Sequence, residues 1–396
     1  MRKLTTAALL GASVLAAPAA ATAEDVKVGV LLGFTGAIES LVADMGPAAE
    51  LALKEASDSG ALLGGLTATP VRGDTTCTDA AVATAAAERL ITSDKVAAIV
   101  GGDCSGVTTA ALQNVALPNG VVMISPSATS PALTTIEDND LFFRTAPSDA
   151  RQGEIVAAIL KDRGVGSVAL TFTNNDYGKG LSDSIAAAFA AAGGEVTINL
   201  PHEDDKGDYA AEVGALAAAG GDMLVVAGYL DKGGKGIIQG ALDTGAFDTF
   251  YLPDGMVGDA LPEALGADLD GSFGATPGTD SDGAAIFAEM AEAAGFKAGP
   301  FAAESYDAAA LIVLAMQAAN STDSADIKAK VFDVANAPGE KIFPGELKKA
   351  LEILKDGGDI DYVGASAVEM IGPGEAAGNY REVKVEGGKL VTVGFR

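Results

Sequence analysis

The chain has 396 residues, with 26 Lys and Arg against 54 Asp and Glu, a formal net charge of -28, one His, two Cys and no Trp. A protein that neutralises nucleic acid phosphates needs clustered Lys and Arg, so this balance excludes nucleic acid as the expected partner. A hydrophobic fraction of 48% excludes a disordered acidic chain, which would lack the apolar area needed to offset its ordering entropy. One His and two Cys offer few metal ligands and few nucleophile and base pairs. We therefore expect a folded protein without catalytic residues, metal or cofactor.

The first residues have the composition of a secretory signal peptide. Two basic residues at positions 2 and 3 precede an apolar run, 4–18, that is too short to span a bilayer. Residues 21–23 read Ala-Thr-Ala, the small-x-small pattern of a signal peptidase site, so we predict cleavage after Ala23. The alternative is a membrane anchor, but no lipobox Cys follows the apolar run. No later stretch reaches the ~20 apolar residues of a membrane helix, and we expect release into an oxidising compartment.

Short apolar runs alternate with Ala-rich helical segments along the first third of the chain. The expected strands are 26–32, 97–100, 121–124 and 141–144, and the expected helices are 48–56 and 107–116. This alternation is typical of βαβ units in a parallel sheet that is covered on both faces.

The same alternation starts again after residue 144. The expected helices are 152–161, 180–192, 209–218, 236–244, 302–320 and 327–334, and the expected strands are 167–172, 195–200, 223–227, 249–252, 365–370, 382–385 and 390–393. A chain of this length exceeds the ~250 to 300 residues at which one core stops growing. We therefore predict an α/β protein with two doubly wound lobes in series, and the pattern does not assign the tail strands to either lobe.

Standard catalytic motifs are missing from the sequence, which has no His-Glu-x-x-His, no nucleophile elbow and no P-loop. His202 stands in the polar segment Pro-His-Glu-Asp-Asp, and we expect it to be a solvated surface residue rather than a metal ligand.

Polar residues follow several predicted strands, at the edge where parallel strands present ligands. The segments with Ser105 and with Ser127 and Thr129 offer hydroxyls and N–H groups that suit a carboxylate. Tyr177 and Asp254 follow strands of the second lobe, as does Tyr229, and Asp254 could hold an ammonium. Together these groups fit a small zwitterion between the lobes, although each also has an ordinary interpretation as a helix cap or turn residue.

Five segments, in this order and after a signal peptide, resemble the leucine/isoleucine/valine-binding proteins. These are type I periplasmic solute-binding proteins of ABC transporters. The segments are 26–36, the Cys77 and Cys104 pair, 125–133 (Ser-Pro-Ser-Ala-Thr-Ser-Pro-Ala-Leu), 176–178 (Asp-Tyr-Gly) and 253–255 (Pro-Asp-Gly).

The resemblance implies two Rossmann-like lobes joined by a hinge of three crossings, near Thr145, Thr276 and Lys355. Lobe 1 would contain residues 24–144 and 277–355, and lobe 2 would contain 145–276 and 356–396, after a signal peptide at 1–23. It also implies a disulfide between Cys77 and Cys104, directly before Ser105.

The resemblance further assigns the ligand contacts. Ser105 and Thr129 would bind the ligand carboxylate, and the Ser127 carbonyl and Thr129 hydroxyl would also lie near the ammonium. Tyr177 and Tyr229 would close over the ligand from lobe 2. Asp254 would pair with the ammonium at a position where the family usually has the longer Glu.

The expected side-chain pocket departs from the family. Asp103 stands where leucine-binding members have an apolar residue, and Leu41 replaces an aromatic residue, while Phe301 and Tyr306 would keep an apolar wall. An unpaired buried carboxylate costs several kcal/mol, so Asp103 either faces solvent or has a partner. Two ligand hypotheses follow: a small aliphatic amino acid, or a polar or basic one that Asp103 recognises with Glu39 or Glu304 nearby.

The resemblance implies a monomeric periplasmic protein that binds an amino acid and delivers it to an inner-membrane ABC permease without bond chemistry. The same fold also serves sensory domains and amide or urea receptors. Asp254 argues against an amide receptor, because a neutral ligand offers it no partner.

Overall fold

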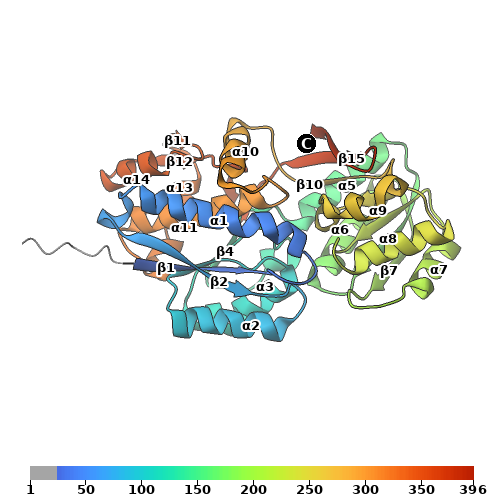
Figure 1. The fold of residues 1–396 in the computed structure, drawn as a ribbon, viewed down its shortest axis with the longest axis horizontal. Helices are drawn as coiled ribbons and strands as arrows, with labels where there is room; N and C mark the ends of the chain where they lie inside the picture. Colours follow the sequence, from blue (N-terminus) through green and yellow to red (C-terminus); the bar gives the residue numbers. More distant parts are fainter. Residues whose placement is uncertain (1–24) are drawn as a thin grey trace, which may run out of the picture.

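The computed structural model describes residues 25–396, so the predicted signal peptide lies outside the described residues. Two seven-stranded sheets form the centres of two lobes that lie side by side along the long axis of the molecule (Figure 1). The predicted fold class of two doubly wound α/β lobes is confirmed.

The lobe 1 sheet is parallel except at one edge, where its last two short strands pair antiparallel. Its strand order is β13 (Met370–Ile371), β14 (Glu375–Ala376), β5 (Phe142–Arg144), β4 (Met123–Ser125), β3 (Ala98–Gly101), β1 (Asp25–Leu32) and β2 (Thr67–Asp74).

The lobe 2 sheet is likewise parallel apart from its last two strands. Its strand order is β16 (Leu390–Phe395), β15 (Tyr380–Val385), β10 (Phe273–Pro277), β9 (Phe250–Leu252), β8 (Met223–Ala227), β6 (Ser167–Thr173) and β7 (Glu195–His202). All five residues of β8 are buried, as expected for a central strand with helices on both faces.

Helices cover both sheets (Figure 1). Around the first sheet lie α1 (Glu39–Asp58), α2 (Ala80–Glu88), α3 (Ser105–Ala111), α4 (Leu117–Asn119), α10 (Asp282–Ala294), α11 (Ala302–Ala319), α12 (Ser324–Lys328), α13 (Val331–Ala335) and α14 (Leu347–Lys355), with a small sheet of β11 (Glu340–Ile342) and β12 (Ile360–Tyr362). Around the second lie α5 (Asp149–Asp162), α6 (Asp176–Ala191), α7 (Ala210–Ala219), α8 (Gly233–Thr244) and α9 (Ala260–Leu265). Short 3-10 or π segments occur at η1 (Leu62–Gly64), η2 (Arg89–Asp94), η3 (Leu112–Ala116), η4 (Pro131–Thr134), η5 (Asp254–Met256) and η6 (Gly266–Leu269).

The chain crosses between the lobes three times. It passes to lobe 2 after β5 and returns after β10, but the last passage lies between β14 and β15 rather than near Lys355. Residues 356–376 therefore accompany lobe 1, because β12 pairs with β11 and Glu375 pairs with Arg144 on β5. Only β15 and β16 of the tail join the lobe 2 sheet.

Several sequence expectations were wrong in detail. The strand β2 went unrecognised because it is an edge strand with alternating exposure that contains Pro70 and Gly73. The helix α1 starts at Glu39 rather than at residue 48, because it continues through Gly46 and Pro47, two residues of low helix propensity. The expected strand at 365–370 is irregular up to β13. None of the helices within residues 25–396 is both long and apolar enough to cross a membrane.

Candidate functional site

Eight of the nine predicted ligand residues line one cavity between the lobes. They are Leu41, Asp103, Ser105, Ser127 and Phe301 from lobe 1 and Tyr177, Tyr229 and Asp254 from lobe 2, and they are joined by Ile38, Cys104 and Gly255. The cavity volume is about 20 Å³, which is enough for about one water molecule. A molecule of amino-acid size can therefore occupy it only when the lobes or the lining side chains move apart.

The lobe 1 wall is a hydroxyl-rich segment around the start of α3. The Oγ of Ser105, the first residue of α3, accepts a hydrogen bond from the Ser130 N–H at 3.1 Å, and the Ser127 hydroxyl donates to the Asp103 carbonyl at 3.2 Å. The disulfide between Cys77 and Cys104 is formed and fixes the residue directly before Ser105.

Thr129 is the predicted residue that does not line the cavity. Its carbonyl accepts a hydrogen bond from the Asp149 N–H at 2.8 Å, and its buried hydroxyl acts on the Asp149 carboxyl, whose pKa it lowers.

Asp103 is buried and paired with protein groups. The Gly33 N–H donates to its Oδ2 at 2.6 Å and the Thr75 hydroxyl donates to its Oδ1 at 2.8 Å. Burial raises the pKa of the Asp103 carboxyl above its usual range, and these hydrogen bonds oppose that shift. Both carboxylate oxygens are thus already engaged within lobe 1, which removes the main reason to expect a cationic ligand side chain.

The lobe 2 wall is built on two tyrosines and one carboxylate. The rings of Tyr177 and Tyr229 stack with centroids 5.1 Å apart and planes 16° apart. The Tyr177 hydroxyl donates to Asp254 Oδ1 at 2.6 Å, and the Gly255 N–H donates to the same oxygen at 2.8 Å. Burial raises the pKa of Asp254, and no Lys or Arg in the described part of the chain forms an ion pair with it.

A second buried carboxylate beside Asp254 was missed by the sequence reasoning. Asp149 is the first residue of α5, and its Oδ1 accepts a hydrogen bond from the Gln152 side chain at 3.0 Å. Burial raises the pKa of Asp149 well above its usual range, and the charge of Asp254 raises it further. Gln152 also accepts from the Asp254 N–H at 3.2 Å, so it joins the two acids. The only sequence signal was a run of polar residues entering a helix just after the first crossing.

Three residues named for the side-chain pocket lie elsewhere. The Tyr306 hydroxyl donates to Glu55, so its ring packs inside lobe 1 instead of forming a wall of the cavity. Glu39 is exposed in the first turn of α1, and Glu304 lines a different cavity.

His202 is buried, so the expectation of a solvated loop residue was wrong. It is the last residue of β7, is 1% exposed, and its Nδ1 lies 2.9 Å from the Thr171 hydroxyl. Burial lowers its pKa to about 4. The strand continues two residues beyond the expected end, which turns the ring into the lobe.

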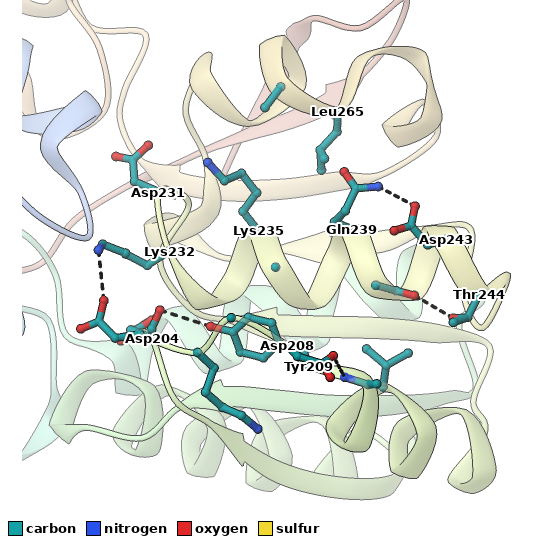
Figure 2. Close-up of a pocket in the computed structure, with 18 residues that line it drawn as sticks. Asp204, Asp208, Tyr209, Asp231, Lys232, Lys235, Gln239, Asp243, Thr244 and Leu265 are labelled. Carbon is teal, nitrogen blue, oxygen red and sulfur yellow. Dashed lines mark hydrogen bonds and ion pairs between the residues drawn. The ribbon is translucent and has the colours of Figure 1, made fainter.

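A much larger hollow, of about 910 Å³, lies on lobe 2 between the loop 204–209 and α8 (Figure 2). None of the predicted ligand residues lines it. Lys232 and Asp205 in its lining form an ion pair at 3.0 Å, and the Tyr209 hydroxyl donates to the carbonyls of Glu203 and Asp204. Size alone therefore does not identify the functional site.

A family model described as a periplasmic binding protein matches residues 25–342. The chain belongs to this family. A Leu/Ile/Val-binding protein homolog 1 of Brucella melitensis is 28% identical over 333 residues, which cover 83% of this chain and 87% of the relative. The predicted membership, drawn from ordered short motifs, is confirmed.

Solved structures of the family have the same fold. A leucine binding protein from Thermotoga maritima has a TM-score of 0.79 at 23% identity, covering 93% of this chain and 98% of its own. A solute binding protein of an ABC transporter from R. palustris, in complex with benzoate, has a TM-score of 0.73 at 21% identity, covering 94% and 96%. The chain is thus a periplasmic binding protein by family, and the solved structures share its fold.

Proposed function

We propose that this protein is the periplasmic substrate-binding component of an ABC transporter for a small aliphatic amino acid. The two lobes close on the zwitterion, and an inner-membrane permease receives it from the closed form. A ligand that contacts both lobes stabilises the closed state by the difference between its contacts in the closed and open states.

The observation that carries this proposal is the buried carboxylate of Asp254. It lacks a cationic partner in the described chain and lines the same cavity as the hydroxyls of Ser105 and Ser127 on the opposite lobe. An unpaired buried charge is costly, and a ligand ammonium would supply the missing partner. A carboxylate on the same ligand would then meet the hydroxyl-rich lobe 1 wall.

The lining of the cavity favours an aliphatic side chain. Ile38, Leu41 and Phe301 are apolar, and the tyrosine rings add two apolar faces. Asp103, the residue that suggested a polar or basic ligand, already has two hydrogen-bond donors in lobe 1. A basic side chain would have to displace or share those bonds.

An aromatic carboxylate is the second candidate ligand, because the R. palustris structure of this fold holds benzoate. Such a ligand would leave Asp254 without a counter-charge in a closed site. We therefore expect benzoate to bind this protein more weakly than leucine, isoleucine or valine.

Isothermal titration calorimetry on refolded, ligand-free protein tests the proposal with leucine, isoleucine, valine, alanine, glutamine, arginine and benzoate. We expect an aliphatic amino acid to bind tightest and Asp254→Ala to weaken it by about a hundredfold, as for removal of a buried charge partner. Asp103→Leu is the matched variant on the other lobe and should leave the order of ligands unchanged. Unaltered affinity in Asp254→Ala would refute the ammonium site, and a preference for arginine that disappears in Asp103→Leu would refute the aliphatic assignment.

A further inference from the structure

A second cavity lies between the lobes on the far side of Phe301. Its volume is about 230 Å³, and Phe301 is the residue that lines both this cavity and the candidate ligand site. It shares Gly299, Pro300 and Arg381 with an outer groove of about 530 Å³ between the lobes. The second cavity therefore adjoins this outer groove.

Glu304 contributes a negative charge to this cavity from α11 of lobe 1. Its side chain is buried, at 3% exposure, and its carboxylate forms no ion pair within residues 25–396. Its position is fixed because its carbonyl accepts a hydrogen bond from the Thr145 hydroxyl at 2.8 Å, at the first crossing between the lobes. Burial raises the pKa of Glu304 to about 7, and the charge of Asp307 adds to this shift, while a backbone hydrogen bond and the charge of Arg381 oppose it.

Arg381 contributes a positive charge to the same cavity from β15 of lobe 2. It is half-buried, it pairs through the backbone with Thr276 on β10, and its guanidinium makes no ion pair with any described residue. Burial lowers the pKa of Arg381, and the charge of Glu304 opposes that shift. The two groups thus influence each other across the cavity although they do not touch.

The remaining lining is mainly apolar and includes Phe287, Phe301 and Phe395. An arginine and a glutamate that face one apolar space without pairing present a donor fork for a carboxylate at one end and an acceptor for an ammonium at the other. We propose that this cavity is a second binding site, which takes a small zwitterion with its carboxylate on Arg381 and its ammonium on Glu304.

The position of the site determines what its occupant would do. Glu304 belongs to lobe 1 and Arg381 to lobe 2, so a zwitterion that bridges them favours the state in which the lobes are together. By linkage, it raises the affinity of the first site, and a ligand in the first site raises the affinity of the second. This site would therefore act as an effector site at the hinge.

The test uses the Asp254→Ala protein, whose first site is expected to be weakened, and calorimetric titration with glycine, β-alanine and 4-aminobutyrate as zwitterions of increasing charge separation. We expect saturable binding of at least one of them, weakened about tenfold or more when Glu304→Gln or Arg381→Met is added. Arg381→Lys keeps the charge but not the fork and should weaken binding less. Glu263→Gln removes a negative charge from the outer groove and should leave the affinity for the zwitterion unchanged.

Circular dichroism checks the fold of each variant. If an Arg381 variant unfolds, the isosteric Glu304→Gln variant alone still tests the site. Absence of saturable binding for all three zwitterions overturns the proposal. So does binding that Glu304→Gln leaves unchanged. Leucine titration of the parent protein is run in parallel, so failure of the first site is recorded separately from failure of the second.

Discussion

The carboxylate of Asp231 in lobe 2 accepts a hydrogen bond from the backbone N–H of Ser40 in lobe 1, with Oδ2 and N 3.0 Å apart. Ser40 lies in the first turn of α1, whose own N-cap residue, Ile38, supplies no side-chain acceptor. The free N–H groups of a helix start are normally satisfied by a cap within the same chain segment. Here the cap comes from the opposite lobe, so α1 is capped only while the lobes are together.

Asp231→Ala should therefore weaken ligand binding by destabilising the closed state alone. Loss of an N-cap costs about 1 kcal/mol, which corresponds to about a fivefold increase in Kd. Calorimetry gives the Kd, and small-angle X-ray scattering gives the fraction of closed molecules at a fixed ligand concentration. A variant with the parent Kd and the parent scattering profile would show that this bond does not contribute to closure.

The ion pair between Lys297 and Asp259 provides the matched control, because it also joins the two lobes. Its atoms are 2.7 Å apart, but the side chains are 71% and 57% exposed. Exposed pairs are screened and worth little. We expect Asp259→Ala to change the Kd by less than about twofold. A larger effect would mean that an exposed contact between the lobes stabilises the closed state as much as the Asp231 bond does.

Asp149 should lower the stability of the protein at neutral pH. Its pKa is raised by burial and by Asp254, so the folded state holds a proton that the unfolded state releases at about pH 3.9. Stability from this group is therefore greatest below the unfolded pKa and is lost as the pH rises toward the folded pKa. Asp149→Asn removes the charge and should raise the free energy of unfolding at pH 7 by about 1 to 2 kcal/mol.

Urea unfolding of the parent and of Asp149→Asn at pH 4 and pH 7 measures that difference. The gain should be larger at pH 7 than at pH 4. A variant that is less stable than the parent at both values would mean that the charged form of Asp149 is stabilised by groups other than Gln152.

The architecture could be read from the sequence because the central strands are continuous apolar runs. The strand β8 is one such run, and its expected bounds agree with the structure. The edge strand β2 escaped because Pro70 and alternating exposure remove that signal. The tail strands pair across long sequence distances, such as Glu375 with Arg144, and no local pattern encodes such a choice of lobe.

The candidate site was predictable to the extent that its residues follow strands or match family motifs. Asp254 and Tyr177 do both, and they lie together in the cavity. The environment of Asp103 was not predictable, because its partner Thr75 is 28 positions away in sequence. Asp149 was missed for the same reason, since its proximity to Asp254 depends on the contact between α5 and η5, which are far apart in sequence.

His202 should make the protein sensitive to mild acid. Burial holds its folded pKa at about 4, below the ordinary value of about 6.5, so between these values protons bind the unfolded state preferentially. Stability is fully present above about pH 6.5 and is lost as the pH falls toward 4, by roughly 3 kcal/mol in total. His202→Asn, which keeps a donor toward Thr171, should flatten this part of the stability curve.

Thermal unfolding of the parent and of His202→Asn between pH 4 and pH 7 checks this expectation. Parallel curves for the two proteins would assign the acid sensitivity to other groups, such as the carboxylates that accept hydrogen bonds.

Removal of the disulfide should reduce both stability and binding. Cys77 and Cys104 are 27 positions apart, and on the chain-entropy model a loop of this length contributes about 3 to 4 kcal/mol. Cys104 also lines the cavity and precedes Ser105, so its release loosens the wall expected to hold the ligand carboxylate. We expect the Cys77→Ala, Cys104→Ala protein to unfold at lower urea concentration and to bind its amino acid more weakly. Dithiothreitol should reproduce both effects in the parent protein and leave the double variant unchanged. A loss of stability with unchanged affinity would show that the disulfide does not position the α3 segment.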